Sequence, residues 1–407
     1  MAPDQKTRLG PITLLSLGHA CVDVYQGTVA ALVPFFVAER AYTLAAASGI
    51  VLAASLLSSV VQPLFGILAD RWVMPWLLPI STVIGGVGLG SAGVSDSYVF
   101  TVTVVAVSGI GVAAYHPAAA RVARAAAGGS HTAMGWFSLG GNVGFATAPL
   151  LVAAVIATGG LRASPWLVVP ALVGAVLCVV ALRRIDTTPV TKAADHAVAR
   201  DDWRSFSKLS GAIVCRSIVF VGLSAFISLY ARERLGGGDA AGTLALFVLY
   251  VGGAFGTVAG GALAGRFGRL RVVRAAYLLT IPAVAGIVFV PGPLLYVFVA
   301  CASAGLYVPF SLHITLGQDY LPRRIGTSSG ITLGLTVSIG GVASPFLGTL
   351  ADATSLQTAL IPLIAIPALG WFLLRTLVEP GVAPSAEESS ALERPLADPD
   401  RIDTSGR

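Results

Sequence analysis

The chain has 407 residues, of which 55% are hydrophobic and only 11% are charged. A soluble globular protein carries about 25% charged residues, and the mean hydropathy of +0.82 also excludes an ordinary soluble fold. The net charge of +6 would suit a nucleic acid, but the basic residues fall between apolar segments. We therefore expect a lipid bilayer, and no nucleic acid, as the partner.

Twelve apolar segments occupy most of the chain. A membrane-spanning helix needs roughly 20 mainly apolar residues. The predicted spans of the first half are 12–36, 44–69, 75–95, 98–120, 132–158 and 165–183. Those of the second half are 209–231, 243–265, 271–290, 293–317, 326–351 and 358–376. The first span exceeds the apolar core of a signal peptide, which is about 7–15 residues long, so we expect a retained helix.

The polar segments divide the chain into two bundles of six helices. We predict an N-terminal bundle at 1–184, a cytoplasmic linker at 185–208 and a C-terminal bundle at 209–378. Residues 379–407 are rich in acidic residues and proline and poor in apolar ones. Such a segment cannot bury enough surface to fold, so we expect a disordered cytoplasmic tail.

The basic residues are distributed unevenly between the two sides of the predicted bundle. Of the 26 Lys and Arg residues, 21 fall on the side of the N-terminus, four fall on the opposite side, and Arg216 lies inside a span. The positive-inside rule places the richer side in the cytoplasm. We therefore expect both termini to be cytoplasmic, in a multi-pass membrane protein.

The two halves carry matching sequence features. Segments 66–71 and 261–266 share the pattern Gly-x-Leu-Ala-x-Arg and end the second and eighth spans. Tyr115-His116-Pro117 in the fourth span corresponds to Tyr307-Val308-Pro309 in the tenth. A parallel repeat of this kind places a substrate site at the interface of the halves, near the membrane midplane.

Ionisable residues fall well inside the predicted spans at only five positions. They lie on the first, fourth, seventh and tenth spans, as His19 and Asp23, His116, Arg216 and His313. A charged group inside a bilayer is costly and usually faces a bundle interior or a water-filled path. One such position in every third helix indicates a shared polar cavity, which is the layout of a transporter.

The polar residues of the first span lie on one helix face. His19, Asp23 and Gln26 are spaced by four and three residues, which aligns them along a helix. A carboxyl group near the midplane can take a proton from one side and release it to the other, although Asp23 could instead make a structural hydrogen bond. His116 fits a proton relay or a helix contact beside a kink at Pro117. We predict Asp23, His19 and His116 as the proton-coupling residues.

Arg216 has three interpretations from the sequence. It could extend to the interface along its apolar stem, attract an anionic or polar substrate, or pair with Asp23. His313 fits an interfacial position as well as a substrate contact. The glycine-rich run 140–144 should allow close helix approach, whereas the buried amide of Asn142 needs a partner. The predicted substrate contacts are Tyr25, Gln26, Tyr115, Asn142, Arg216 and His313.

These motifs together resemble a known group. Twelve spans in two parallel repeats, with Gly-x-x-x-Asp-Arg at 66–71, resemble the major facilitator superfamily. Gly18-His19…Asp23…Gly27, Tyr115-His116-Pro117 and the segments 317–324 and 330–335 resemble its fosmidomycin-resistance family of bacterial efflux proteins. The resemblance implies the all-α fold of twelve transmembrane helices in two pseudo-symmetric bundles, and export of a toxic compound in exchange for protons.

By the same resemblance, Asp70, Arg71 and Arg266 would gate the conformational change. Two positions depart from the pattern. Ala118 follows His-Pro where family members often carry an acidic residue, which leaves a second proton-coupling carboxylate in doubt. Gly265 stands in the second repeat where Asp70 stands in the first.

The sequence thus predicts a monomeric, proton-coupled exporter of a small organic compound or drug, with no metal and no cofactor besides the proton gradient. An uptake symporter or uniporter of the same fold is the alternative, because the residues do not fix the direction. A membrane-embedded enzyme using His and Asp as acid and base is a third hypothesis. It lacks a visible nucleophile, a metal partner and an ATP-binding motif.

Overall fold

The computed structural model describes residues 9–72, 74–127, 131–185 and 200–380, and within them every regular element is a helix. The first half contains α1 (Leu9–Arg40), α2 (Leu44–Arg71), α3 (Leu77–Gly90), α4 (Tyr98–Ala127), α5 (His131–Ile156), the 3-10 helix η1 (Gly160–Val168) and α6 (Val169–Arg183). The second half contains α7 (Trp203–Leu235), α8 (Gly238–Phe267), α9 (Arg269–Phe289), α10 (Leu294–Tyr307), α11 (Phe310–Tyr320), α12 (Ile325–Ala353), α13 (Leu356–Leu360) and α14 (Pro362–Leu374).

Each predicted span coincides with one helix or with two consecutive helices. The tenth span is divided between α10 and α11 at Pro309, and the twelfth between α13 and α14 before Pro362, since proline lacks the N–H that a continuous helix requires. Among the described residues, nine helical segments are long and apolar enough to cross a membrane, and Leu44–Leu56 and Leu77–Gly90 are shorter apolar helices. The all-α membrane fold is confirmed, whereas the crossing of all twelve spans stays a prediction.

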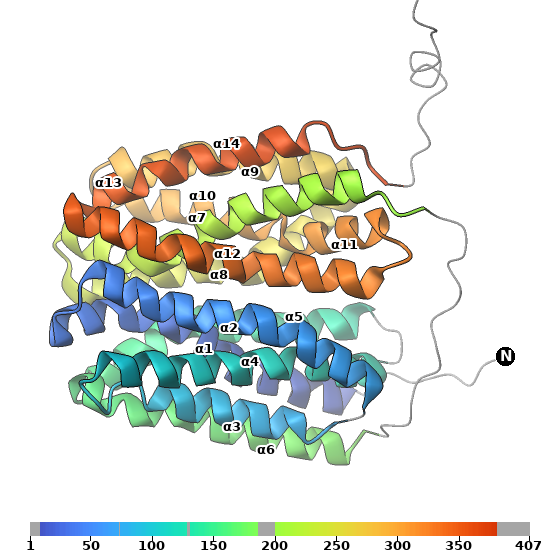
Figure 1. Ribbon diagram of the computed structural model, residues 1–407, viewed down its shortest axis with the longest axis horizontal. Coiled ribbons are helices and arrows are strands. Elements are labelled where there is room, and N and C mark those ends of the chain that lie inside the picture. Colours follow the sequence, from blue (N-terminus) through green and yellow to red (C-terminus); the bar gives the residue numbers. More distant parts are fainter. Residues whose placement is uncertain (1–8, 73, 128–130, 186–199, 381–407) are drawn as a thin grey trace, which may run out of the picture.

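The helices of the two halves form two bundles that lie side by side with parallel axes (Figure 1). Across the boundary α2 packs along α12, and α5 packs along α8. Small residues allow the close approach of α2 and α12. A Cβ atom added to Gly341 would lie 2.6 Å from the Cβ atom of Ser55, and one on Gly348 would lie 2.7 Å from the Leu44 carbonyl oxygen.

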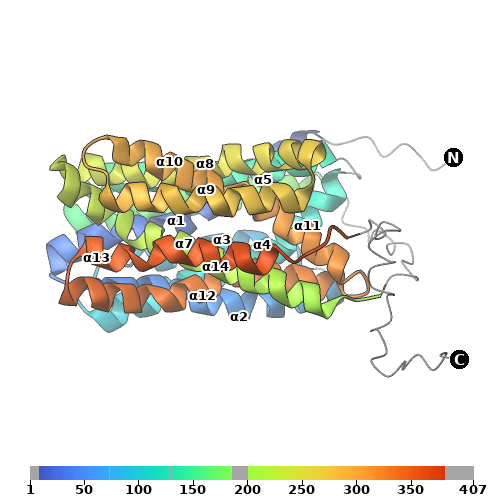
Figure 2. The same cartoon turned by 90° about the horizontal axis from the view of Figure 1, so that it is seen from above.

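The start of α1 and the end of α14 lie at the same end of the molecule (Figures 1 and 2). At the opposite end, the Asp352 carboxylate of α12 accepts hydrogen bonds from the N–H groups of Leu44 and Ala45, both at 2.8 Å. A carboxylate is stabilised at a helix N-terminus by the helix dipole. One half of the molecule therefore caps a helix of the other. Which end faces the cytoplasm stays a prediction.

The structure refines two predicted boundaries. Helix α7 begins at Trp203 rather than at residue 209, because the Asp202 carboxylate accepts a hydrogen bond from the Ser205 N–H at 3.0 Å and caps the helix. Hydrogen bonds from the side chain and the backbone N–H of Ser205 lower the pKa of Asp202 below its usual value. Glu379, the first residue of the predicted tail, pairs with Arg269 at 2.6 Å. The remaining residues of the linker and the tail, 186–199 and 381–407, lie outside the described residues.

Candidate functional site

Four of the predicted site residues meet inside the N-terminal bundle. Asp23 is buried on α1, and its Oδ1 lies 3.0 Å from the His116 Nε2 of α4. Its Oδ2 lies 3.2 Å from the His19 Nε2, one turn earlier on α1. The Gln26 amide donates a hydrogen bond to Oδ1 at 3.0 Å. We call His19, Asp23, Gln26 and His116 the Asp23 cluster.

Backbone carbonyls hold both imidazole rings of the Asp23 cluster in place. The Nδ1 atom of His19 lies 2.9 Å from the Phe137 carbonyl oxygen, and that of His116 lies 2.7 Å from the Val112 carbonyl oxygen. A carbonyl oxygen only accepts hydrogen bonds, so each Nδ1 must carry a hydrogen. In both rings it is therefore Nε2 that faces the Asp23 carboxylate.

Helix α5 forms a wall of the cluster that the sequence did not identify. The Phe137 ring stacks on His19, with ring centroids 4.3 Å apart. One turn further along α5, a Cβ atom on Gly141 would lie 2.5 Å from the Asp23 Oδ2 and 2.7 Å from the His19 Cε1. Gly141 thus makes room for the carboxylate. The one-turn spacing of Phe137 and Gly141 was visible in the sequence, but their contact with α1 was not.

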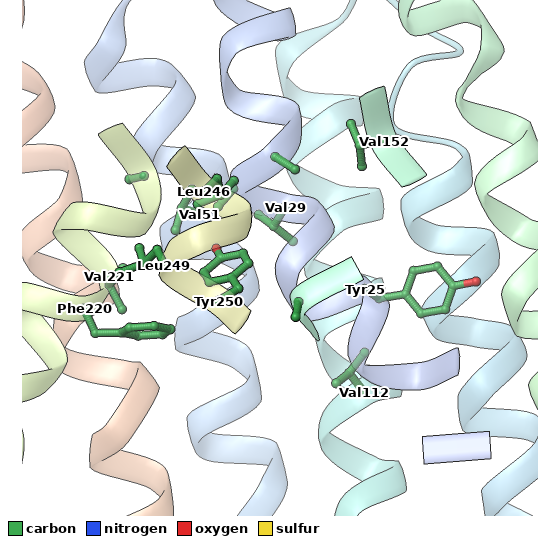
Figure 3. Close-up of a cluster of buried hydrophobic side chains, with 14 of the residues drawn as sticks. Tyr25, Val29, Val51, Val112, Val152, Phe220, Val221, Leu246, Leu249 and Tyr250 are labelled. Atoms are coloured by element: carbon green, nitrogen blue, oxygen red, sulfur yellow. The ribbon is translucent and has the colours of Figure 1, made fainter. Parts of the chain in front are cut away.

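The Asp23 cluster lies one helical turn from the boundary between the halves. A Cβ atom on Gly27 would lie 3.4 Å from the Tyr250 ring of α8 and 2.7 Å from the Phe145 carbonyl oxygen of α5. The Phe145 and Tyr250 rings meet with centroids 4.3 Å apart. Figure 3 shows Tyr250 of the second half close to Val29 of α1. A shift of α1 would therefore change its packing against α8 of the second half.

Arg216 occupies a separate, enclosed position in the C-terminal bundle. Its side chain is buried, and its Nε donates to the Leu306 carbonyl oxygen at the end of α10. The aromatic rings of Phe220, Tyr307 and Phe310 lie 5.7, 5.9 and 5.3 Å from its Cζ. The interpretation that the Arg216 side chain reaches the membrane–water interface is wrong, because the guanidinium is enclosed by protein. Within the described residues no ion pair joins it to Asp23.

Tyr25 and Tyr115 lie beside the cluster without bonding to it. The Tyr25 hydroxyl donates to the Leu167 carbonyl oxygen at 2.8 Å, and the side chain points away from Tyr250 (Figure 3). Tyr115 is fully buried, with its ring centroid 5.9 Å from that of His19. Both side chains therefore support the walls of the site.

Asn142 and His313 also lie away from the Asp23 cluster. Asn142 is half-buried, and within the described residues no hydrogen bond joins it to the cluster. His313 is buried, with its Nε2 3.5 Å from the Tyr277 hydroxyl. His313 thus lies in the interior of the C-terminal bundle and not at the membrane–water interface. Their assignment as substrate contacts stays a prediction.

The structure says little about the three predicted gating residues. The side chains of Asp70 and Arg71 lie outside the described residues. Arg266 is exposed, and its Cζ lies 5.2 Å from the ring centroid of Phe267. Their gating role stays a prediction.

The Asp23 cluster also presents atoms of the kind that bind metals. The side-chain atoms of His19, Asp23 and His116 that could hold an ion lie within 4.8 Å of one another. Two imidazoles and a carboxylate suit a transition metal. The same atoms also lie within hydrogen-bonding distance of one another, as the members of a proton-binding cluster would.

Comparison with known proteins places these features in a family. The model of the Major Facilitator Superfamily matches residues 15–345. The chain is 29% identical to the fosmidomycin resistance protein of Escherichia coli (strain K12) over 380 residues, which cover 90% of this chain and 92% of that protein.

Solved structures share the fold. A bacterial homologue of the human lysosomal transporter Spinster, in an inward-facing and unoccupied conformation, matches with a TM-score of 0.74 and 16% identity, over 94% of this chain and 100% of that one. The Escherichia coli fucose:proton symporter matches with a TM-score of 0.63 and 16% identity, over 90% and 98%. At these identities the likeness concerns the fold alone.

Proposed function

The chain belongs to the Major Facilitator Superfamily, and from this premise we propose that it exports a small organic compound in exchange for protons, with the Asp23 cluster as the proton site. The superfamily membership makes the protein a multi-pass membrane transporter of a small molecule and not an enzyme. Proton coupling, export and the residues that perform them are the proposal.

The observation that carries the proposal is the number of hydrogens the Asp23 cluster needs. Both Nδ1 atoms already donate to backbone carbonyls, so a neutral His19 or His116 has only a lone pair at Nε2. Each Nε2 nevertheless lies within 3.2 Å of a carboxylate oxygen. A hydrogen on the His116 Nε2 would be donated to Oδ1, whereas the His19 Nε2 lies close to Oδ2 without making an aligned hydrogen bond. We therefore take the proton shared by His116 and Asp23 as the exchangeable one.

The loss of this proton turns an attractive contact into a repulsive one. With the proton present, the Asp23 Oδ1 accepts hydrogen bonds from His116 and from Gln26. After it leaves, the His116 Nε2 lone pair faces Oδ1 at 3.0 Å and the two repel, with the Gln26 amide 3.4 Å from that Nε2. His116 is the natural exit, because its side chain is 24% exposed whereas that of His19 is 10% exposed.

This repulsion acts on helices that touch the other half. His116 belongs to α4, and Asp23 belongs to α1, whose Gly27 packs against Tyr250 of α8. Proton release therefore favours a different packing of α1 against α4, and α1 transmits the change to the boundary. Alternating access then follows from rocking of the two bundles about a central site.

Export rather than uptake is supported by the likeness to a resistance protein. Uptake by proton symport is the second candidate, because a fucose:proton symporter shares the fold. The two directions of coupling predict opposite pH changes. When substrate enters sealed liposomes, an antiporter moves protons out and the lumen becomes alkaline, whereas a symporter makes the lumen acidic.

The test is proton movement in liposomes that contain the purified protein and a pH-sensitive dye. A panel of small organic compounds, including a phosphonate, is added outside to wild-type protein, to Asp23→Asn and to Asp96→Asn. Asp96 is the matched control because its side chain is 92% exposed and pairs only with Arg40 among the described residues.

We expect a compound that makes the lumen alkaline with wild-type protein and with Asp96→Asn, and no response with Asp23→Asn. Acidification that depends on Asp23 would replace export by symport. Proton movement that survives in Asp23→Asn would show that the protons travel elsewhere.

A further inference from the structure

The Nε2 atom of His19 is the part of the Asp23 cluster that proton coupling leaves unexplained. It is buried and has no hydrogen-bond partner among the described residues, although it lies 3.2 Å from the Asp23 Oδ2. The Nδ1 atom of the same ring carries its hydrogen, which is donated to the Phe137 carbonyl oxygen. A neutral His19 therefore places an unused lone pair beside a carboxylate oxygen. Since both atoms carry negative charge, the contact is unfavourable unless a cation joins them.

A metal ion fits this contact better than a proton does. A hydrogen bond requires the hydrogen to lie near the line between donor and acceptor, whereas a metal ion binds lone pairs that converge on a third point. A tetrahedral Zn²⁺ ion with bonds of about 2.0–2.1 Å holds its ligand atoms about 3.3 Å apart. In the cluster, 3.2 Å separates the His19 Nε2 from the Asp23 Oδ2, and 3.0 Å separates the His116 Nε2 from Oδ1.

The three side chains are close enough to bind one ion together. One ligand atom from each of His19, Asp23 and His116 lies within 4.8 Å of the other two. A tetrahedral ion would draw the most widely separated pair together by about 1.5 Å at most. His116 can make this adjustment, because its side chain is 24% exposed and thus not tightly packed.

The second hydrogen bonds of the two imidazoles are those of metal-binding histidines. A histidine that binds a metal commonly donates its other ring N–H to a carboxylate or a backbone carbonyl, which fixes the orientation of the ring. The Nδ1 atoms of His19 and His116 lie 2.9 Å from the Phe137 and 2.7 Å from the Val112 carbonyl oxygens. Both Nε2 atoms are therefore already turned toward the Asp23 carboxylate before any ion binds.

Gln26 and the opening beside His116 complete the site. The Gln26 amide nitrogen lies 3.0 Å from the Asp23 Oδ1 and 3.4 Å from the His116 Nε2, so the reversed amide would present its oxygen as a fourth ligand. Gln26 is half-buried and His116 is partly exposed, which leaves this side of the cluster open to an ion. Two imidazoles and one carboxylate suit Zn²⁺, Co²⁺ or Ni²⁺, whereas Mg²⁺ prefers oxygen ligands.

We propose that the Asp23 cluster binds one divalent transition-metal ion through the His19 Nε2, an Asp23 carboxylate oxygen and the His116 Nε2, and that the bound ion blocks transport. The ion would join α1 to α4 and occupy the atoms that otherwise share the exchangeable proton. The block rests on the proposed transport function, but binding of the ion does not. The sequence predicted no metal, because His116 lies far along the chain from the other two ligands.

The first test is binding of Zn²⁺ to the purified full-length protein in detergent, without an affinity tag, by isothermal titration calorimetry. Wild-type protein should bind one Zn²⁺ ion and should not bind Mg²⁺. His19→Gln, Asp23→Asn and His116→Gln should each weaken Zn²⁺ binding at least tenfold, because each substitution removes one of the three ligands.

Two control variants show whether other histidines or carboxylates bind the ion. His313→Gln removes a buried histidine of the C-terminal bundle, and Asp96→Asn removes an exposed carboxylate. Both should bind Zn²⁺ like wild-type protein. Failure of wild-type protein to bind Zn²⁺, or equal affinity in the three cluster variants, would overturn the inference.

A measurement on wild-type protein decides the matter if the cluster variants fail to fold. Co²⁺ often replaces Zn²⁺, and its visible absorption becomes stronger when fewer than six ligands surround it. Wild-type protein should strengthen the absorption of Co²⁺, and added Zn²⁺ should reverse the change. A spectrum equal to that of Co²⁺ in buffer would contradict the site.

The block is tested by substrate-driven proton movement in liposomes, with Zn²⁺ on both sides of the membrane. Zn²⁺ should inhibit wild-type protein and a chelator should restore its activity. Relative to its own rate without zinc, His19→Gln should need at least tenfold more Zn²⁺ for half-inhibition. Equal sensitivity of the two proteins would remove the block. Zn²⁺ binding to wild-type protein together with proton movement in Asp23→Asn would refute the proposed function alone.

Discussion

Asp23 and Arg216 are charged side chains on the first helix of each bundle, and their surroundings differ. Asp23 has Gln26, His19 and His116 within 3.2 Å of its carboxylate. Arg216 has one carbonyl oxygen, three aromatic rings and a buried nitrogen without a partner. The charge of Asp23 is thus matched by polar groups of the protein, whereas the charge of Arg216 is not neutralised by any carboxylate among the described residues.

The two halves also differ at the positions where their sequences correspond, around Pro117 and Pro309. Helix α4 continues through Pro117, and its His116 completes the Asp23 cluster. The corresponding Pro309 separates α10 from α11, and the ring of Phe310, the first residue of α11, lies 5.3 Å from the Arg216 Cζ. Corresponding positions thus carry an ionisable ring in one half and an interrupted helix in the other.

The largest expected effect comes from filling the space beside Asp23. In Gly141→Ala the added methyl group would overlap the Asp23 Oδ2 and the His19 ring. Because displacements of about 1 Å can cost on the order of 100-fold in activity, transport should fall on the order of 10- to 100-fold. The measurement is substrate-driven proton flux in liposomes.

The matched control for Gly141 lies on the same helix. A Cβ atom added to Gly135 meets no atom within 4 Å, so Gly135→Ala should transport like wild-type protein. Equal activity of the two alanine variants would mean that α5 does not position the carboxylate.

Substitutions at the two charged residues should have different effects on the stability of the ligand-free protein. Asp23→Ala removes the acceptor of the Gln26 amide and of the two imidazoles, and leaving buried donors unpaired costs about 1–3 kcal/mol each. Arg216→Met removes a desolvated charge without breaking an ion pair, so its stability should equal or exceed that of wild-type protein. The thermal unfolding midpoints in detergent provide the comparison. A large loss in Arg216→Met would make Arg216 a structural residue.

A smaller effect is expected at the contact between the halves. Asp352→Ala removes the carboxylate that caps α2, an interaction of about 1 kcal/mol at a helix N-terminus. The halves should separate more often at this end, so a cysteine introduced by Phe35→Cys, in the pocket that Phe35 lines together with Ser228 of α7, should react with a thiol reagent about fivefold faster. Asp96→Ala is the control, because Asp96 pairs with Arg40 within one half. Equal labelling rates would show that Asp352 does not hold the halves together.

The smallest effect concerns the start of the helix that carries Arg216. Asp202→Ala should lower the stability of the start of α7 by about 1 kcal/mol, the usual effect of losing a helix cap. Since the folded pKa of Asp202 is lowered, its contribution is present at neutral pH and is lost as the pH falls through that lowered pKa. Hydrogen exchange at Phe206 and Lys208 should increase in the variant at neutral pH. No difference there would show that the cap is dispensable.

Much of the Asp23 cluster was predictable from the sequence, because it depends on local spacing. The intervals between His19, Asp23 and Gln26 define a helix face, and His116 stood out as an ionisable residue inside the fourth span. The role of Gly141 was not predictable, since it depends on how closely α5 approaches α1. Neither was the enclosure of Arg216, because its distance from solvent depends on where α10 and α11 lie.

The positions of the helices could be predicted from the hydropathy of the sequence for a similar reason. Apolar segments of about 20 residues have few alternatives to a helix in a bilayer, so each helix was found and its ends were predicted to within about two helical turns. The contact of Asp352 with Leu44 and Ala45 joins residues about 300 positions apart. Nothing in the local sequence of either partner specifies such a contact.

The most direct test of the account is exchange of a radiolabelled substrate in liposomes with equal pH on both sides, followed by accumulation under a pH gradient. The substrate is a compound that moves protons with wild-type protein. We predict that Asp23→Asn keeps exchange and loses gradient-driven accumulation, because it removes the proton site and leaves the binding site intact. Gradient-driven accumulation by Asp23→Asn at the wild-type rate would contradict the account.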